Sequence, residues 1–127
     1  METPKFVYTD GGKLGSNLHE RCDCTVIALA NARGIAYSDA HLILKNAGRK
    51  NSCKFRMTHF LDDIDYALPL PGPFHSTAKR FATEHPIGIF IVRVRGHVFA
   101  IINGVIHDNF DSSLKRIKRV WKIKPSS

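Results

Sequence analysis

The first two-thirds of the chain has the hydrophobic spacing of helices. Residues 24–33 predict a helix with Asp23 as its N-cap and Gly34 at its C-terminal end. Because residues 26–30 are all apolar, we expect this helix to be buried on most sides, at the centre of the fold. Three further helices are predicted, from a cap at Ser38 to about residue 47, from a cap at Thr58 to about residue 66, and from Ser76 or Thr77 to about residue 85.

The second of these helices has apolar positions with a period of about 3.6 residues. We expect it to bury one stripe of side chains, made of Ala40, Ile43, Leu44 and Ala47. The polar and basic stretch 49–56 that follows predicts a loop.

The last third of the chain has the composition of strands. Residues 89–94 and 97–102 are β-branched and aromatic, and Asn103-Gly104 is a strong two-residue hairpin signal before residues 105–108. These segments predict an antiparallel meander, to which 120–123 could add a last strand, and residues 6–8 form a short extended piece. Helices followed by strands predict an α+β fold, with the helices packed on one side of the sheet.

Length and composition fit one domain over residues 1–127, with 43% apolar residues. Apolar runs such as 26–30 reach five residues, whereas a bilayer-spanning helix needs about 20, so we expect no membrane span. The N-terminal residues lack the charged-then-apolar order of a secretory signal. We therefore expect a protein of the reducing cytoplasm, the host's cytoplasm for a phage gene, with its three cysteines as free thiols.

The chain is basic, with 19 Lys and Arg against 11 Asp and Glu. Six cations with no acid among them lie in the last 14 residues: Lys115, Arg116, Lys118, Arg119, Lys122 and Lys124. Such a patch attracts phosphate or an acidic surface, but a solvated face of the fold is the simpler interpretation. The alternation of Trp121 and Ile123 with lysines is equally typical of an edge strand that lysines protect from aggregation.

Cys24 is the strongest candidate for a nucleophile. It is predicted at the first turn of a buried helix, where peptide N–H groups and the helix dipole favour a thiolate. Cys22 lies before the predicted cap, outside the best reach of the dipole. For a single cysteine, a small buried apolar side chain is the commoner role.

The hairpin register identifies a base for this nucleophile. With Asn103-Gly104 as the turn, Phe99 lies opposite Asp108, and His97 is on the same face of its strand as Phe99. Asp108 is then a diagonal neighbour of His97 and can hold its tautomer, while Asn109 and His107 point to the other face. Cys24, His97 and Asp108 therefore predict a nucleophile-base-acid triad.

The order Cys, His, Asp with an N-terminal nucleophile helix and a C-terminal β-meander resembles the papain-like cysteine peptidase fold. Stretches 8–12, 23–30, 96–100 and 104–108 are similar to those of small phage and bacterial proteins of that type. The resemblance implies the same three residues in the same roles. Papain-like enzymes commonly carry a Gln about six residues before the nucleophile as oxyanion donor, and Leu18 stands there in this chain. Asn17, His19 or the backbone N–H of Cys24 would have to serve, and we select Asn17.

We therefore expect a thiol peptidase or amide hydrolase without a cofactor, acting on a protein or peptide substrate. The basic patch would attract an acidic substrate. Two alternatives remain open. A zinc site could use Cys22, Cys24 and Cys53 with His19 or His59, although the spacing is poor for one. A non-catalytic module could bind nucleic acid or an acidic partner through the basic patch. The sequence leaves the substrate and the oligomeric state open.

Overall fold

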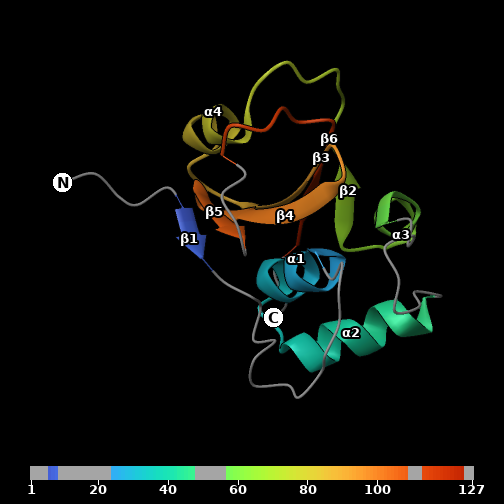
Figure 1. Cartoon of the computed structure of the whole chain (residues 1–127). Coiled ribbons are helices and arrows are strands. Elements are labelled where there is room, and N and C mark those ends of the chain that lie inside the picture. The colour runs from blue at the N-terminus through green and yellow to red at the C-terminus, as the bar shows by residue number, and fades with distance from the viewer. Residues whose placement is uncertain (1–5, 9–23, 48–56, 109–112, 125–127) are drawn as a thin grey trace.

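The computed structural model describes residues 6–8, 24–47, 57–108 and 113–124, and structural statements below refer to them. Along the chain the elements are β1 (Phe6–Tyr8), α1 (Cys24–Arg33), α2 (Tyr37–Asn46), α3 (Met57–Asp63), β2 (Ala67–Pro69), α4 (Ala78–Glu84), β3 (Ile89–Val94), β4 (His97–Ile102), β5 (Val105–Asp108) and β6 (Arg119–Ile123). The fold is α+β, as predicted, and Figure 1 shows the sheet between the helices.

The six strands form one sheet in the order β1-β5-β4-β3-β6-β2. All neighbours are antiparallel except β1, which is parallel to β5. The predicted hairpin register is confirmed over its paired residues, with Ala100 opposite His107 and Ile102 opposite Val105. Asn103 and Gly104 have φ values of 48° and 79°, as a turn that follows the twist of the strands requires.

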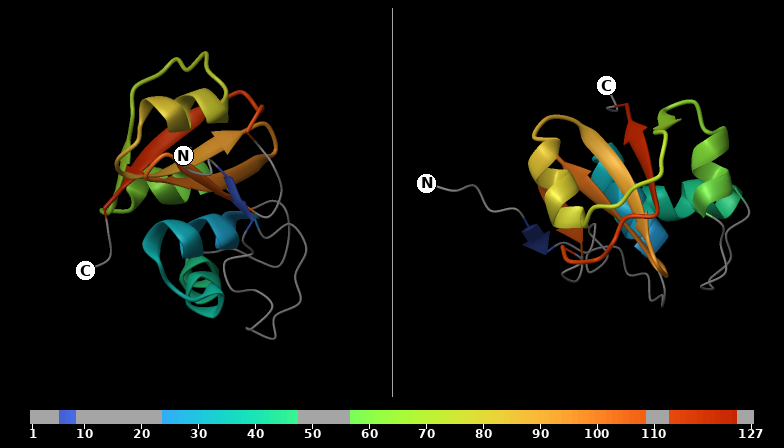
Figure 2. Two further views of the ribbon diagram at one scale, coloured as in Figure 1. Left: turned by 90° about the vertical axis from the view of Figure 1, so that its left-hand side faces the viewer. Right: turned by 90° about the horizontal axis from the view of Figure 1, so that it is seen from above.

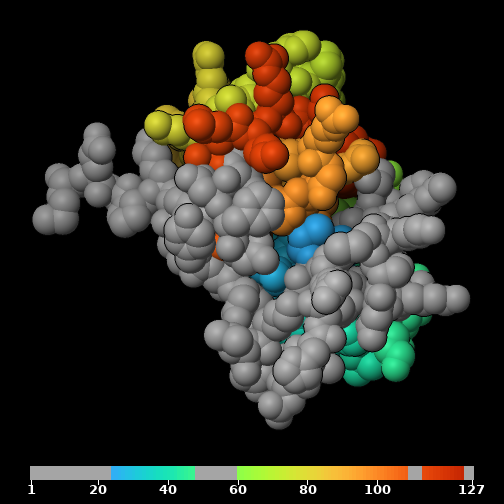
Figure 3. Space-filling view, viewed as in Figure 1, coloured from blue at the N-terminus to red at the C-terminus, as the bar shows by residue number. Residues whose placement is uncertain are grey.

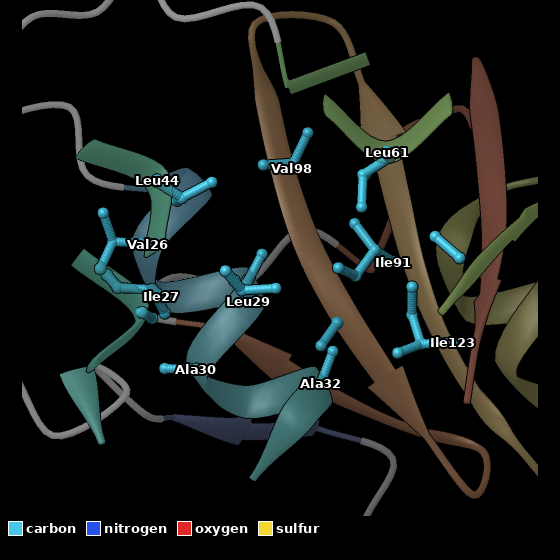
Figure 4. Close-up of a cluster of buried hydrophobic side chains, with 14 of the residues drawn as sticks. Val26, Ile27, Leu29, Ala30, Ala32, Leu44, Leu61, Ile91, Val98 and Ile123 are labelled. Atoms are coloured by element: carbon cyan, nitrogen blue, oxygen red, sulfur yellow. The ribbon is translucent and has the colours of Figure 1, made fainter. Parts of the chain in front are cut away.

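α1 lies against one face of the sheet, and its bounds are those predicted. Its apolar run is buried on all sides because β3 and β4 cover it on one side and α2 on the other. Gly34 ends the helix with φ 65°, a conformation that disfavours residues with a Cβ. Figure 4 shows this core, in which Val26, Ile27 and Leu29 of α1 lie between Leu44 of α2 and Val98 and Ile91 of the sheet.

α4 covers the opposite face of the sheet, so the expectation that all helices lie on one side is wrong. Its buried residues Ala78, Phe81 and Ala82 pack on Phe90 and Ile101. Figures 1 and 2 show α4 on one side of the sheet and α1 and α2 on the other. The central strand β4 is therefore buried on both faces, and only its last residue is partly exposed.

Two helix starts differ from the prediction. α2 begins at Tyr37, with Ala36 as N-cap and no side-chain cap bond, so Ser38 lies inside the helix. Burial of Tyr37, together with Ala40 and Leu44, sets the buried stripe, while Ile43 and Ala47 are exposed. Thr58 likewise lies within α3 rather than before it.

α3 ends at Asp63, before the predicted end at residue 66, because the next backbone joins the sheet. The Tyr66 carbonyl accepts a hydrogen bond from the Lys124 N–H, and β2 then pairs with β6. β6 is thus an interior strand between β3 and β2, and the edge-strand interpretation of its lysines is wrong.

α4 begins as one of the two predicted caps requires. Thr77 is the N-cap, and its hydroxyl oxygen accepts a hydrogen bond from the Arg80 N–H at 3.3 Å. Among the described residues, no helix has the length and the apolar composition to cross a bilayer. The predicted cap Asp23 and the predicted loop 49–56 lie outside the described residues.

Candidate active site

Cys24 is the first residue of α1, as predicted, and its thiol is free and partly buried. Its side chain packs against the core between α1 and the sheet. Because the first turn of a helix has backbone N–H groups without partners in the helix, a negative charge on this sulfur is favoured there. The rest of α1 is buried, so the position of the sulfur is fixed by packing rather than by a loop.

His97 is the first residue of β4, and only 9% of it is exposed. Its ring stacks on Phe99, with a centroid distance of 5.7 Å and an interplanar angle of 27°. This contact restricts the ring because Phe99 is itself buried under α4. Phe99 is not among the predicted site residues, although its alternation with His97 along the strand indicates the shared face.

Asp108 is the last residue of β5, and only 1% of it is exposed. Its carboxylate Oδ2 lies 2.7 Å from Nε2 of His97, which confirms the predicted diagonal contact. β5 is held on both sides, by β4 and by β1, where Tyr8 is opposite Asp108. The carboxylate is therefore placed by three strands.

The His97 side chain also forms a hydrogen bond with the Cys24 side chain. Since Nε2 is engaged by Asp108, Nδ1 is the ring nitrogen left for the sulfur. α1 packs on the face of Val98 and Ala100, opposite to that of Phe99, so the contact cannot form through the sheet. It forms because Cys24 and His97 both begin their elements, which places the ring at the end of β4.

The surroundings of His97 favour its protonated form. Burial lowers its pKa, but the hydrogen bonds to Asp108 and Cys24, and the charges of these groups, outweigh burial and raise the pKa from 6.5 to about 9. The ring is therefore a cation at neutral pH, with the Cys24 sulfur on one side and the Asp108 carboxylate on the other. The three side chains thus lie in one line of contact, which is the arrangement that a nucleophile, a base and an orienting acid require.

His107 and His85 lie in different surroundings from His97. His107 alternates to the other face from Asp108, and burial lowers its pKa. The His85 ring stacks on that of Phe81 with a centroid distance of 3.9 Å, and its Nδ1 forms a hydrogen bond with the Phe81 carbonyl. This ring therefore caps the C-terminal end of α4.

Several predicted candidates lie outside the described residues: Asn17, Cys22, Cys53 and His19, together with the side chain of His59. The oxyanion role of Asn17 and the alternative zinc site therefore stay predictions. Among the side chains that the structure does describe, no group of three His, Cys, Asp or Glu could hold a metal ion.

The basic patch of residues 115–124 is not one surface. Arg119 forms an ion pair with Asp62 of α3 at 2.8 Å and stacks over the ring of Trp121. Lys122 lies opposite Phe90 in β3, far along that strand from Val94, which is opposite His97. Lys115, Arg116 and Lys118 are exposed and precede β6. The six cations thus divide between the two ends of the sheet.

Comparison of the chain with family models, with curated proteins and with solved structures found no match. The papain-like resemblance therefore stays a prediction from the sequence.

Proposed function

We propose that this protein is a cysteine-dependent hydrolase of amide bonds, a papain-like thiol peptidase or isopeptide hydrolase, with Cys24 as nucleophile, His97 as base and Asp108 as orienting acid. The observation that supports this most is the continuous contact from thiol to imidazole to carboxylate. This line of contact joins α1, β4 and β5, and the Asp108 carboxylate at its end is buried. Besides the carboxylate, the ring also contacts the Cys24 side chain, so one imidazole joins the proposed nucleophile to the proposed orienting acid.

The reaction follows from the charges of the three groups. The Cys24 thiolate attacks the carbonyl carbon, a C–S bond forms, and the carbonyl π electrons move to the oxygen. The tetrahedral intermediate collapses when the C–N bond breaks, and the leaving nitrogen takes the proton from Nδ1 of His97. Water then gives a proton back to Nδ1 and attacks the thioester, and cleavage of the C–S bond releases the acid and restores the thiolate.

Asp108 acts on the ring throughout this cycle. Its hydrogen bond holds Nε2 as a donor, so Nδ1 is the nitrogen that gains and loses the proton. Because the carboxylate is buried, water does not compete with the ring for this hydrogen bond. The backbone N–H of Cys24 and the side chain of Asn17 are the oxyanion donors that we propose.

The chemistry also indicates where the protein works. A catalytic thiolate has to stay reduced, which a reducing cytoplasm ensures, the host's cytoplasm for a phage protein. We propose a protein or peptide substrate, because the nucleophile attacks a carbonyl.

The test uses p-nitrophenyl acetate as an acyl donor. We expect an acetyl group on Cys24, found by peptide mass spectrometry, and steady release of nitrophenolate beyond one equivalent. His97→Ala should slow turnover at least 100-fold, which is the lower range for a general acid–base group. Cys24→Ala should abolish the adduct, and a double variant Cys22→Ser/Cys53→Ser should retain turnover as the matched control.

Turnover that persists in Cys24→Ala, or an acetyl adduct that forms and decays equally fast in His97→Ala, would contradict the proposed triad. Circular dichroism of each variant shows whether it is folded. Cys24→Ser provides a second variant that changes one atom, so that loss of folding cannot be mistaken for loss of chemistry.

A further inference from the structure

Two arginines lie next to the histidine of the candidate site. Val94 is opposite His97 and Arg93 is opposite Val98, while Arg95 belongs to the turn that leads directly into His97. Both arginines are exposed. The backbones of Arg93 and Arg95 therefore lie within two residues or one strand spacing of the His97 backbone, a distance of about 5–7 Å.

A second basic segment is attached to the same end of the sheet. The Lys118 N–H donates a hydrogen bond to the Arg93 carbonyl at 2.8 Å. The backbone of Arg116 forms an isolated antiparallel β-bridge with that of Thr77. Lys115, Arg116 and Lys118 are all exposed. In the space-filling view, the red-orange side chains of segment 113–118 and the orange side chains of the β3–β4 region lie together, next to the blue surface of α1 (Figure 3).

These two segments contain no compensating acid. Residues 85–107 and 113–124 include no Asp or Glu. Arg119 forms an ion pair with Asp62, so we do not count its charge with those of the other cations. Arg93, Arg95, Lys115, Arg116 and Lys118 remain as an exposed group of one sign, called the cationic rim below.

We propose that the cationic rim selects acidic polypeptide substrates, by binding carboxylates that flank the carbonyl to be attacked by Cys24. This inference rests on the proposed function. The backbones that carry Arg93 and Arg95 are closer to His97 than the Debye length of about 8 Å at physiological salt, so we expect the rim to act on an anion that enters the site. Acidic side chains near the scissile bond would be attracted, and basic ones repelled.

A polypeptide fits the rim better than a nucleic acid. Proteins that bind single-stranded nucleic acid combine cations with exposed aromatic rings on which bases stack. The aromatic residues of the strands beside the rim are buried, with Phe90, Phe99 and Trp121 at most 4% exposed. The rim therefore offers charge without a stacking platform.

The first test compares an anionic with a neutral alkylating reagent at Cys24. Iodoacetate and iodoacetamide share one reaction, so the ratio of their rates reports the electrostatic potential at the sulfur. We expect Arg95→Gln/Lys118→Gln to lower the iodoacetate to iodoacetamide ratio about 3- to 10-fold at low salt, with a smaller effect in 0.5 M NaCl. The iodoacetamide rate itself should change little.

The matched control removes two charges elsewhere. Lys122 lies opposite Phe90, four residues along β3 from the residue that faces His97, and Lys124 lies two residues beyond Lys122; both are exposed. Lys122→Gln/Lys124→Gln should leave the ratio within about 1.5-fold of the unaltered protein, because four residues of a strand span about 13 Å, which is more than a Debye length. Equal ratios in the two double variants would overturn the cationic rim.

The second test measures protection of Cys24 from iodoacetamide by three polymers. A Glu-rich decapeptide should protect the thiol in the unaltered protein and should lose most of that effect in Arg95→Gln/Lys118→Gln, while a Lys-rich decapeptide should not protect. Equal or better protection by a single-stranded DNA decamer would overturn the choice of a polypeptide. Absence of turnover with p-nitrophenyl acetate would refute the proposed hydrolase, whereas an unchanged reagent ratio would refute the rim alone.

Discussion

Replacing Asp108 by Asn isolates the electrostatic part of the contact with His97. Asn has nearly the same shape, and its amide oxygen can accept the same hydrogen bond from Nε2. The replacement removes the negative charge, which is one of the groups that raise the pKa of His97 to about 9. Burial of the ring, which lowers that pKa, is unchanged.

The size of the effect follows from the pKa. A rise from 6.5 to about 9 corresponds to roughly 3 kcal/mol in favour of the protonated ring, at about 1.4 kcal/mol per pKa unit, before solvent screening reduces it. Asp108 contributes through both its hydrogen bond and its charge. We therefore expect the pKa of His97 to fall by more than about one unit in Asp108→Asn.

Nuclear magnetic resonance measures this pKa directly. The Cε1 proton of His97 would be followed from pH 5 to pH 10.5 in both proteins, with His97→Gln to assign the signal. An unchanged midpoint in Asp108→Asn would refute the reasoning, because it would mean that the carboxylate does not stabilise the cationic ring.

The same contact makes stability depend on pH. The pKa of His97 is raised in the folded protein, so its stabilising contribution is fully present below about pH 6.5 and is lost as pH rises through about 9. The free energy of unfolding in urea should therefore fall between pH 7 and pH 10 by more in the unaltered protein than in His97→Gln. Parallel pH profiles would contradict this linkage.

Three further predictions concern the scaffold. Leu29→Ala, at a position with no exposed surface, should lower the free energy of unfolding by about 2–5 kcal/mol in urea titrations, and a loss below 1 kcal/mol would mean that the core collapses around the gap. Asp62→Ala should cost about 1–3 kcal/mol because Asp62 accepts hydrogen bonds from both Arg119 and the Trp121 indole; Asp63→Ala is the matched control, and equal losses would contradict the role of Asp62. Gly34→Ala should lower thermal stability by about 1 kcal/mol from the positive φ alone, since no atom lies within 4 Å of the added Cβ, and no loss would show that the backbone adjusts.

The parts of the site that depend on local signals could be predicted from the sequence. The Asn103-Gly104 turn has one favoured register, and that register brings Asp108 beside His97. The bounds of α1 follow from its apolar run and from Gly34. Both predictions use residues close together in the chain, where propensity and spacing are informative.

The arrangement of the layers depends on contacts between distant segments and was predicted less well. The unbroken apolar stretch of β4 is typical of a strand covered on both faces, yet the expectation of a single helical layer left α4 on the wrong side. Ala67–Pro69 has no pattern that indicates a strand, because its pairing with β6 determines it. The pairing of Arg119 with Asp62 was equally outside the reach of spacing arguments.

The thiol and the imidazole are far apart in the chain, at residues 24 and 97, and meet where the start of α1 lies near the start of β4. A newly synthesised chain therefore has Cys24 long before it has a folded His97, and during that interval the sulfur is an ordinary alkyl thiol. We expect the reactivity of this sulfur to rise when α1 docks against the start of β4, so that pulse labelling of Cys24 would time this step of folding.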